Sequence, residues 1–319
     1  MEDQATMSST NQILLFLLSS SYCYYLVAKM RRGISRFIFI IPVLYFFFSL
    51  PWNFSSSFLR GIFAFFITWI ASFKLLLFCF CKGPLVTCRS LVDFVAITAF
   101  PVKIRDHHDL PSPSMDSETL LKLAGNVLLQ LQLNSFAGQC DATQFTNFLY
   151  GTSVFIWFHT MLASDSSPVR FMPRYELVSL FNRPYLATSL QDFWGRRWNR
   201  MSSYILRVSV YEPTRETLAG LIGSGRARVV AIITTLVVSG IMHEVILYYI
   251  TCGRRPTWEV TWFFILHGLF MGLEVAFRAR YWSPLPVFIS VPLTVGFTVI
   301  TSCWLLVLPV WRNATNKCE

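Results

Sequence analysis

Residues 229–250 read VVAIITTLVVSGIMHEVILYYI, an apolar run whose only residues of the types His, Asp, Glu, Lys and Arg are His243 and Glu244. The hydrocarbon core of a bilayer is about 30 Å thick and needs roughly 20 helical residues to cross it. The run therefore predicts a membrane-spanning helix. Arginines mark both of its limits, at positions 226, 228, 254 and 255.

Other apolar runs predict further spans on both sides of this one. The strongest lie at residues 13–28, 34–52, 58–81, 260–277 and 286–310, with weaker candidates at 85–100 and 145–162. Counted together, they predict an all-α, multi-span transmembrane bundle of seven or eight helices. No internal repeat or separate soluble region interrupts the pattern, so we expect one integral membrane domain over residues 1–319.

The composition agrees with a chain that meets lipid. Of its 319 residues, 54% are hydrophobic and only 14% are charged, whereas soluble domains carry about 25% charged residues. The net charge of +10 comes largely from arginines beside or between apolar runs, which is typical of the cytoplasmic loops of membrane proteins. A nucleic-acid-binding protein would carry a basic soluble face, and we expect no nucleic-acid partner.

The basic residues also predict an orientation. Lys29, Arg31 and Arg32 follow the first apolar run, so the positive-inside tendency places the N-terminus in the lumen and the first loop in the cytosol. Eight arginines lie within residues 183–228, and we expect this segment in the cytosol too. The loop that contains Asn53, the first residue of an N-x-S sequon, is then lumenal.

The middle of the chain and the cysteines indicate no site. Residues 105–117 contain adjacent His107 and His108 but predict a solvated connector, because sequence neighbours rarely share metal-ligand geometry. Residues 120–133 predict an amphipathic helix in the membrane interface. The eight cysteines include no CxxC pair, so they indicate neither a disulfide framework nor a zinc site.

His243 and Glu244 are candidates for chemistry because they lie inside an apolar span. Such side chains cost several kcal/mol unless they are paired or face a wet cavity. Gly240 and Ser239 share the helix face of His243 and leave room for a substrate or for close helix packing. Imidazole suits a general base for an alcohol. The alternative is a structural His–Glu hydrogen bond that locks helices together.

A second candidate segment, residues 191–199, reads QDFWGRRWN. As an α-helix it would pair Asp192 with Arg196 at i, i+4 and put Trp194 and Trp198 on one face. Arginines favour phosphates, such as those of coenzyme A, and tryptophan with arginine favours the membrane interface. The alternative on this chemistry is a positive-inside loop with aromatic anchors.

Both segments resemble the plant wax synthase branch of the membrane-bound O-acyltransferases, which includes long-chain-alcohol and sterol O-acyltransferases. The resemblance is carried by LATSLQDFWGRRWN at residues 186–199 and by VSGIMHE at residues 238–244. Shorter matches lie at residues 73–78, 83–85, 205–207 and 210–211. The matches follow one another in order along most of the chain.

The resemblance implies a tunnel-bearing helical bundle in the endoplasmic reticulum membrane. Such a protein transfers a fatty acyl group from acyl-CoA to a long-chain alcohol, as in wax ester synthesis, or to a sterol. His243 would deprotonate the acceptor hydroxyl, and Asn199 would orient the acyl donor or stabilise the developing oxyanion. Acyl-CoA would serve as co-substrate, with no metal, redox cofactor or covalent acyl-enzyme. Expected substrate-binding residues in the signature region 185–250 are Asp192, Trp194, Arg196, Arg197, Trp198, Gly240 and Glu244.

The chain departs from the family pattern between residues 102 and 174, and at Arg207, after which relatives tend to have a proline. A catalytically inactive, lipid-binding relative is therefore one alternative. A transporter is another, but it would more often show repeated halves or interrupted helices in matching positions. The sequence shows neither, and it does not choose between a fatty alcohol and a sterol as acceptor.

Overall fold

The computed structural model describes residues 2–104, 175–177, 180–280 and 285–313. The chain divides into two compact units, one of residues 1–104, 245–256 and 315–319 and the other of residues 105–244 and 257–314. The expectation of a single integral membrane domain is not tested by this division and stays a prediction. The predicted connector with His107 and His108, the amphipathic helix at 120–133 and the span at 145–162 lie outside the described residues.

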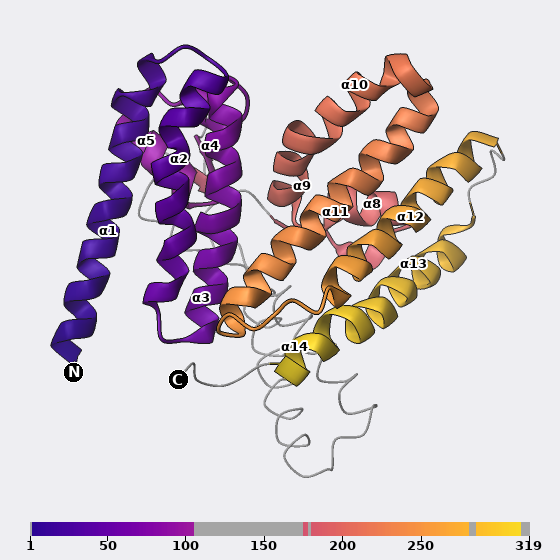
Figure 1. Ribbon diagram of the computed structural model, residues 1–319. Coiled ribbons are helices and arrows are strands. Elements are labelled where there is room, and N and C mark those ends of the chain that lie inside the picture. Colours follow the sequence, from indigo (N-terminus) through magenta and orange to yellow (C-terminus); the bar gives the residue numbers. More distant parts are fainter. Residues whose placement is uncertain (1, 105–174, 178–179, 281–284, 314–319) are drawn as a thin grey trace, which may run out of the picture. The chain divides into compact units, whose positions relative to one another are not determined.

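The first unit is a helical bundle (Figure 1). Its α-helices are α1 (Glu2–Tyr25), α2 (Ile34–Ser49), α3 (Ser57–Phe63), α4 (Ser72–Cys79) and α5 (Leu91–Ala99). A π-helical turn, η3 (Ala64–Ala71), joins α3 to α4 in one continuous helix. Short 3₁₀ turns connect the other helices: η1 (Val27–Lys29), η2 (Leu50–Asn53) and η4 (Pro84–Thr87). A three-residue strand, β1 (Val102–Ile104), follows α5.

Two buried cationic side chains donate hydrogen bonds to backbone carbonyls at the ends of helices and in the turns of this unit. Arg36 donates hydrogen bonds to the backbone carbonyls of Ala28 and Met30, at 2.6 and 3.1 Å. Lys74, only 2% exposed, donates to the carbonyl of Phe100 at 3.0 Å and to that of Ile97. The last carbonyls of a helix lack intrahelical partners and carry partial negative charge, so Lys74 stabilises the C-terminal end of α5.

The second unit contains a short helical region followed by long helices. The strand β2 (Tyr175–Leu177), the 3₁₀ turn η6 (Pro184–Leu186), α8 (Leu190–Asp192), the π-helix η7 (Phe193–Arg197) and α9 (Arg200–Leu206) come first. The π-helix η8 (Arg207–Tyr211) and α10 (Glu212–Ile222) lead to α11 (Ser224–Ile250), whose residues from 245 onward belong to the first unit. The remaining elements are α12 (Glu259–Arg280), α13 (Val287–Ser302), the π-helix η9 (Cys303–Val307) and α14 (Leu308–Asn313).

Glycines let α11 and α12 pack closely along their length (Figure 1). A Cβ atom built on Gly240 of α11 would lie 3.0 Å from Thr261 Cα of α12. Cβ atoms on Gly268 and Gly272 of α12 would lie 3.4 Å from Ile233 Cα and 3.0 Å from Val229 Cγ1 of α11. Small residues at such contacts are how membrane helices approach one another.

Within the described residues, five helices are long and apolar enough to cross a membrane: Ile34–Asn53, Leu59–Cys79, Ser224–Ile250, Glu259–Phe277 and Val287–Val307. They correspond to five of the predicted spans and confirm a multi-span helical membrane protein. α1 contains most of the predicted first span but is not among the five. The predicted count of seven or eight spans stays a prediction.

The predicted span at residues 85–100 is wrong. The only α-helix there, α5, has nine residues and rises about 14 Å, too little to cross a bilayer. Ser90 starts α5 by accepting a hydrogen bond from the Asp93 N–H. Phe100 ends it in an extended conformation, as expected for a residue that precedes a proline.

The described cysteines include both a disulfide-bonded residue and free thiols. Cys252 is disulfide-bonded, although the sequence indicated no disulfide. Cys23, Cys79, Cys81 and Cys88 are free thiols, and the first two are buried.

Candidate functional site

The segment 191–199 forms a π-helical turn rather than the α-helix that the sequence predicted. Over η7, the N–H of Trp198 donates to the carbonyl of Phe193, five residues earlier, at 2.8 Å. A π-turn brings residues i and i+5 together, and such turns often occur at functional sites. The pairing of side chains in this segment therefore differs from the α-helical expectation.

Asp192 pairs with Arg197, and the expected Asp192–Arg196 pair is wrong. Asp192 Oδ2 accepts a hydrogen bond from Arg197 Nε at 2.6 Å and from the Thr188 N–H at 3.3 Å. Arg197 Nη1 also donates to the carbonyl of Arg183 at 3.2 Å. Arg196 is exposed. The π-turn explains the exchange because it rotates position 197, not 196, toward Asp192.

Trp194 and Trp198 do not share a face. The ring of Trp198 stacks on Phe193, at a centroid distance of 5.5 Å, and lies edge-on to Phe181 at 4.8 Å. Trp194 instead contacts Phe263 and Phe264 of α12, at 6.1 and 5.4 Å. The two tryptophans thus anchor different surfaces, and Trp194 is the one that reaches α12.

Asn199 caps α9 from a left-handed backbone conformation, with φ of 40°. Asparagine tolerates this conformation better than most residues. Its Oδ1 accepts a hydrogen bond from the Ser202 N–H at 3.2 Å, which satisfies an amide of the first helical turn. This contact fixes the carboxamide, so its Nδ2 group is the donor face.

His243 has one ring nitrogen committed to its own helix. Nδ1 lies 2.7 Å from the carbonyl oxygen of Ser239, one turn earlier on α11. A carbonyl can only accept, so Nδ1 must carry the proton and the lone pair lies on Nε2. The ring packs against Phe264 of α12 at a centroid distance of 4.5 Å.

Glu244 caps α12. The first intrahelical hydrogen bond of α12 runs from the Trp262 N–H to the Trp258 carbonyl, so the Thr261 N–H has no partner within the helix. Glu244 Oε1 accepts from that N–H at 3.1 Å, and the side chain is 3% exposed. A carboxylate is favoured at a helix N-terminus, so Glu244 does what a serine or aspartate does at most N-caps.

Gly240 serves helix packing, one of the two interpretations that the sequence left open. The space in front of its missing Cβ is filled by Thr261 and Phe264 of α12. Because Phe264 also contacts His243, the close approach at Gly240 determines where the imidazole lies against α12.

Sequence reasoning missed His267, which is completely buried on α12. Its Nδ1 accepts a hydrogen bond from the Trp194 indole at 3.0 Å, because an indole N–H can only donate. Nε2 must therefore carry the proton, and it donates to Thr301 Oγ1 on α13 at 2.8 Å. A polar residue inside the 260–277 run was the available signal, and its pairing with Trp194 could not be read from spacing.

α12 joins the two candidate segments. Phe264 contacts His243 on one side and Trp194 on the other. Glu274, further along α12, accepts a hydrogen bond from the Gln191 N–H at 3.1 Å. Ser203 Oγ of α9 donates to the carbonyl of Trp194 at 2.6 Å, which connects Trp194 to the helix that Asn199 caps. The described residues contain no group of three metal-ligating side chains.

Two buried hydroxyls lie beside these groups. Ser202 Oγ, on the turn capped by Asn199, and Thr261 Oγ1, beside Gly240, have no hydrogen-bond partner within the described ranges. An unpaired buried hydroxyl costs about 1–3 kcal/mol. Groups of this kind suit a site that is completed by a polar part of a substrate.

Comparison with known proteins places this site in a family. Residues 177–266 match the membrane bound O-acyl transferase family. The chain is 36% identical over 320 residues to acyl-CoA–sterol O-acyltransferase 1 of Arabidopsis thaliana, which covers 96% of this chain and 89% of that protein. It is also 36% identical over 310 residues to probable long-chain-alcohol O-fatty-acyltransferase 2 of the same plant, covering 94% and 89%.

A third relative, putative long-chain-alcohol O-fatty-acyltransferase 10 of Arabidopsis thaliana, is 38% identical over 291 residues, covering 89% of this chain and 84% of that protein. The 96% coverage by the sterol acyltransferase includes most of residues 102–174, which the sequence reading had set apart from the family pattern. The match at 177–266 contains Asn199, His243, Phe264 and Glu244. The chain belongs to the membrane-bound O-acyltransferase family.

Proposed function

We propose that the protein transfers a fatty acyl group from acyl-CoA to the hydroxyl of a long-chain alcohol, releasing a wax ester and coenzyme A. The observation that carries the proposal is the arrangement of His243. Its Nδ1 is bound to the Ser239 carbonyl, which leaves the basic lone pair on Nε2, and Phe264 links its ring to Trp194 of the signature segment. A neutral imidazole in a helical span suits a general base.

In the proposed reaction, Nε2 of His243 takes the proton of the acceptor hydroxyl as its oxygen attacks the thioester carbonyl. The carbonyl oxygen becomes an oxyanion, and Nδ2 of Asn199 donates a hydrogen bond to it. When the tetrahedral intermediate collapses, the carbon–sulfur bond breaks and the thiolate takes the proton from the imidazolium. The products are then the ester and coenzyme A, and the proposed reaction uses no third substrate or cofactor.

The acceptor is proposed from the relatives. Several are named long-chain-alcohol O-fatty-acyltransferases, which supports a fatty alcohol. A sterol is the second candidate, because a relative that is 36% identical is named as a sterol acyltransferase. Both acceptors are large and apolar with one hydroxyl, so the same base and oxyanion donor serve either.

An acceptor panel tests the proposal. Membranes containing the protein are incubated with labelled palmitoyl-CoA and a long-chain alcohol, a sterol or a diacylglycerol, and the labelled esters are separated. We expect labelled wax ester with the alcohol and none with membranes lacking the protein. Sterol ester alone would move the assignment to the second candidate. No ester with any acceptor would support a non-enzymatic lipid-binding relative instead.

We also propose the endoplasmic reticulum membrane as the location, with residues 183–228 in the cytosol, where acyl-CoA is made. The support is at the other end of α11. There Cys252 is disulfide-bonded, and Trp52, beside the Asn53 sequon, lies within 3.4 Å of the Cβ position of Gly253. Disulfides and N-glycans both belong to the lumenal side.

A protease-accessible tag tests this orientation. A tag inserted at Gly223, an exposed residue between α10 and α11, should be cleaved in sealed microsomes without detergent. A tag inserted at Arg255 should be cleaved only after detergent is added. Protection of the tag at Gly223 would invert the topology.

A further inference from the structure

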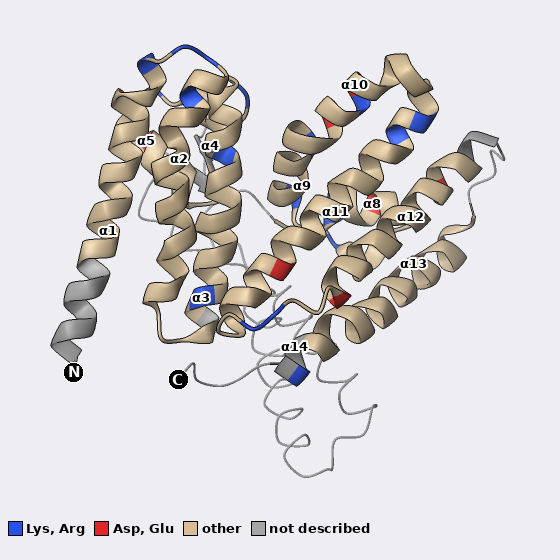
Figure 2. Ribbon diagram, viewed as in Figure 1, with Lys and Arg blue, Asp and Glu red and all other residues tan. Residues whose placement is uncertain are grey.

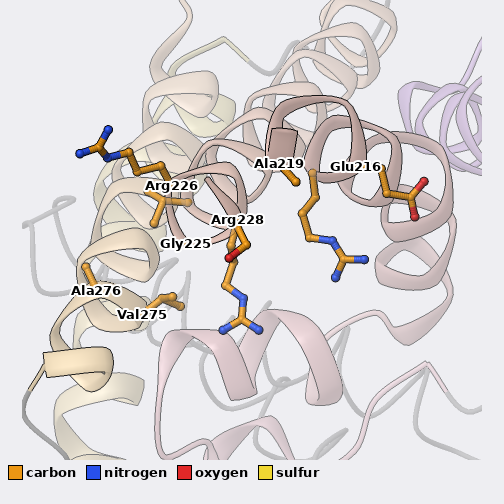
Figure 3. Close-up of a pocket in the computed structure, with 10 residues that line it drawn as sticks. Glu216, Ala219, Gly225, Arg226, Arg228, Val275 and Ala276 are labelled. Atoms are coloured by element: carbon orange, nitrogen blue, oxygen red, sulfur yellow. The ribbon is translucent and has the colours of Figure 1, made fainter. Parts of the chain in front are cut away.

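A pocket of about 840 Å³ lies where α10, α11 and α12 meet (Figure 3). Its charged lining residues are Arg215 and Glu216 of α10 and Arg226 and Arg228 of α11. Ala219, Val229, Val275 and Ala276 supply an apolar wall. In Figure 3 the side chain of Arg228 extends into the middle of this region, whereas those of Arg226 and Glu216 point outward on opposite sides.

The pocket has an excess of positive charge. Its lining contains three arginines and one glutamate. Arg197, Arg207 and Arg312 each form an ion pair with a carboxylate elsewhere, but the three pocket arginines form none with a residue in the described part of the chain. Figure 2 shows basic residues at this end of α11, where the helix dipole adds partial positive charge.

We propose that this pocket binds the phosphate groups of the acyl-CoA donor, an inference that rests on the proposed function. Arginine binds phosphate through two parallel hydrogen bonds and a full charge. The volume is within the range of about 300–1,000 Å³ that is usual for small-molecule sites. The apolar wall beside the arginines suits the adenine ring that a nucleotide carries next to its phosphates.

The distance along α11 fits this donor. Arg228 precedes His243 by 15 residues, which corresponds to about 22 Å of helix rise. At 100° per residue, Gly225, Arg228 and Val229 lie within about 60° of the His243 face of the helix. An extended chain advances roughly 1.2 Å per bond, so the roughly 15 bonds from the diphosphate of coenzyme A to its sulfur reach about 18 Å. The arginine side chain covers the remainder.

Arg215 and Arg228 are better placed to bind phosphate than Arg197, because they form no ion pair with a described residue. The sequence placed this role on Arg196 and Arg197, but the guanidinium of Arg197 is held by Asp192 and by the Arg183 carbonyl. Arg215, which lies over the ring of Tyr211, and Arg228 have no such commitment to a carboxylate among the described residues. They can therefore be neutralised by a ligand.

Binding measured without turnover tests the assignment. The purified full-length chain in phosphatidylcholine nanodiscs is titrated with coenzyme A and with pantetheine, which lacks the phosphates. We expect Arg215→Gln and Arg228→Gln each to weaken coenzyme A binding by roughly ten- to a hundredfold and to remove the preference over pantetheine. Arg228→Lys, which keeps the charge, should lose less. Arg32→Gln, an equal charge change at an exposed residue of the first unit, is the matched control and should bind as wild type.

The outcomes separate this inference from the proposed function. Wild-type affinity in both pocket variants would overturn the pocket and leave the acyltransferase standing. Loss of coenzyme A binding in the variants of a chain that forms no ester would support the pocket and overturn the proposed function. A third arm titrates dihexanoyl phosphatidic acid. If the variants lose only this ligand, the pocket takes a phospholipid headgroup and the donor assignment is overturned.

Discussion

His243 and His267 hold opposite ring tautomers. Nδ1 of His243 donates to the carbonyl of Ser239, so its lone pair is on Nε2. Nδ1 of His267 accepts from the Trp194 indole, so its lone pair is already engaged and its proton goes to Thr301. The two imidazoles therefore differ in which ring nitrogen can take up a proton. His243 is the candidate base, and His267 is a positioning residue for the signature segment.

Replacing His243 tests the base. His243→Ala should lower ester formation by about 10²- to 10⁴-fold, the usual contribution of general-base catalysis, while expression and membrane insertion stay near normal. His243→Asn should recover nothing, because a carboxamide does not take up a proton near neutral pH. Initial rates are measured at saturating acyl-CoA, so that weakened donor binding is not mistaken for lost chemistry. A rate within about threefold of wild type would remove His243 from this role.

Replacing Asn199 separates its two tasks. Asn199→Asp keeps an acceptor for the Ser202 N–H and tolerates the left-handed backbone, but it removes the amide donor. We expect thermal stability near wild type and a rate about 10²- to 10³-fold lower, as for the loss of one oxyanion donor. Asn199→His should retain part of the activity, because imidazole also donates. If Asn199→Asp is fully active, Asn199 is only a helix cap.

Replacing Trp194 tests the link to α12. Trp194→Phe removes the indole donor and leaves Nδ1 of the buried His267 unpaired, which costs about 1–3 kcal/mol. We expect a lower melting temperature in detergent. The double variant Trp194→Phe, His267→Phe should lose less stability than the two single losses added together, because neither partner is then left unsatisfied. Additive losses would show that the two side chains do not interact.

Replacing Gly240 tests the close approach of α11 and α12. The added Cβ of Gly240→Ala would lie 3.0 Å from Thr261 Cα, a backbone atom that cannot turn away. We expect a loss of about 1–3 kcal/mol from overpacking and a lower rate, because Phe264 and His243 are displaced together. Gly296→Ala on α13 is the matched control, since nothing lies within 4 Å of its Cβ. Equal behaviour of the two variants would contradict the packing role.

Replacing Glu244 separates capping from chemistry. Glu244→Gln keeps an oxygen that accepts from the Thr261 N–H, so we expect activity within about an order of magnitude of wild type at slightly lower stability. Glu244→Ala leaves that N–H buried and unpaired and should cost about 1–3 kcal/mol. Thermal unfolding and ester formation are measured on the same preparations. An inactive but stable Glu244→Gln would assign the carboxylate to the reaction itself.

Much of the architecture could be predicted because membrane spans depend on apolar length alone. The five runs of α2, the helix formed by α3, η3 and α4, and α11, α12 and α13 are readable from composition over about 20 residues. The prediction for residues 85–100 failed because the helix begins only after its N-cap Ser90 and ends before Pro101, which a window average does not detect. The choice of His243 followed from an ionisable group in hydrocarbon, and its role remains a prediction.

The side-chain pairs within residues 191–199 could not be predicted, because they depend on a π-helical turn, in which residues i and i+5 are joined. An α-helical period pairs Asp192 with Arg196, but the π-turn pairs it with Arg197. Tertiary partners were equally hidden from the sequence. The cap that Glu244 provides for the Thr261 N–H, 17 residues later, and the Trp194–His267 bond, 73 residues apart, follow from how α12 packs.

The position of α12 outside both signature segments has a consequence for surveys of gene families. We expect a gene copy that keeps QDFWGRRWN and SGIMHE unchanged to lose activity when Phe264 or His267 is replaced, because these side chains contact His243 and Trp194. Sorting paralogues into working and decayed copies by their signatures would pass such a copy as intact. Positions 264 and 267 are therefore sensible additional markers when gene copies of this family are compared.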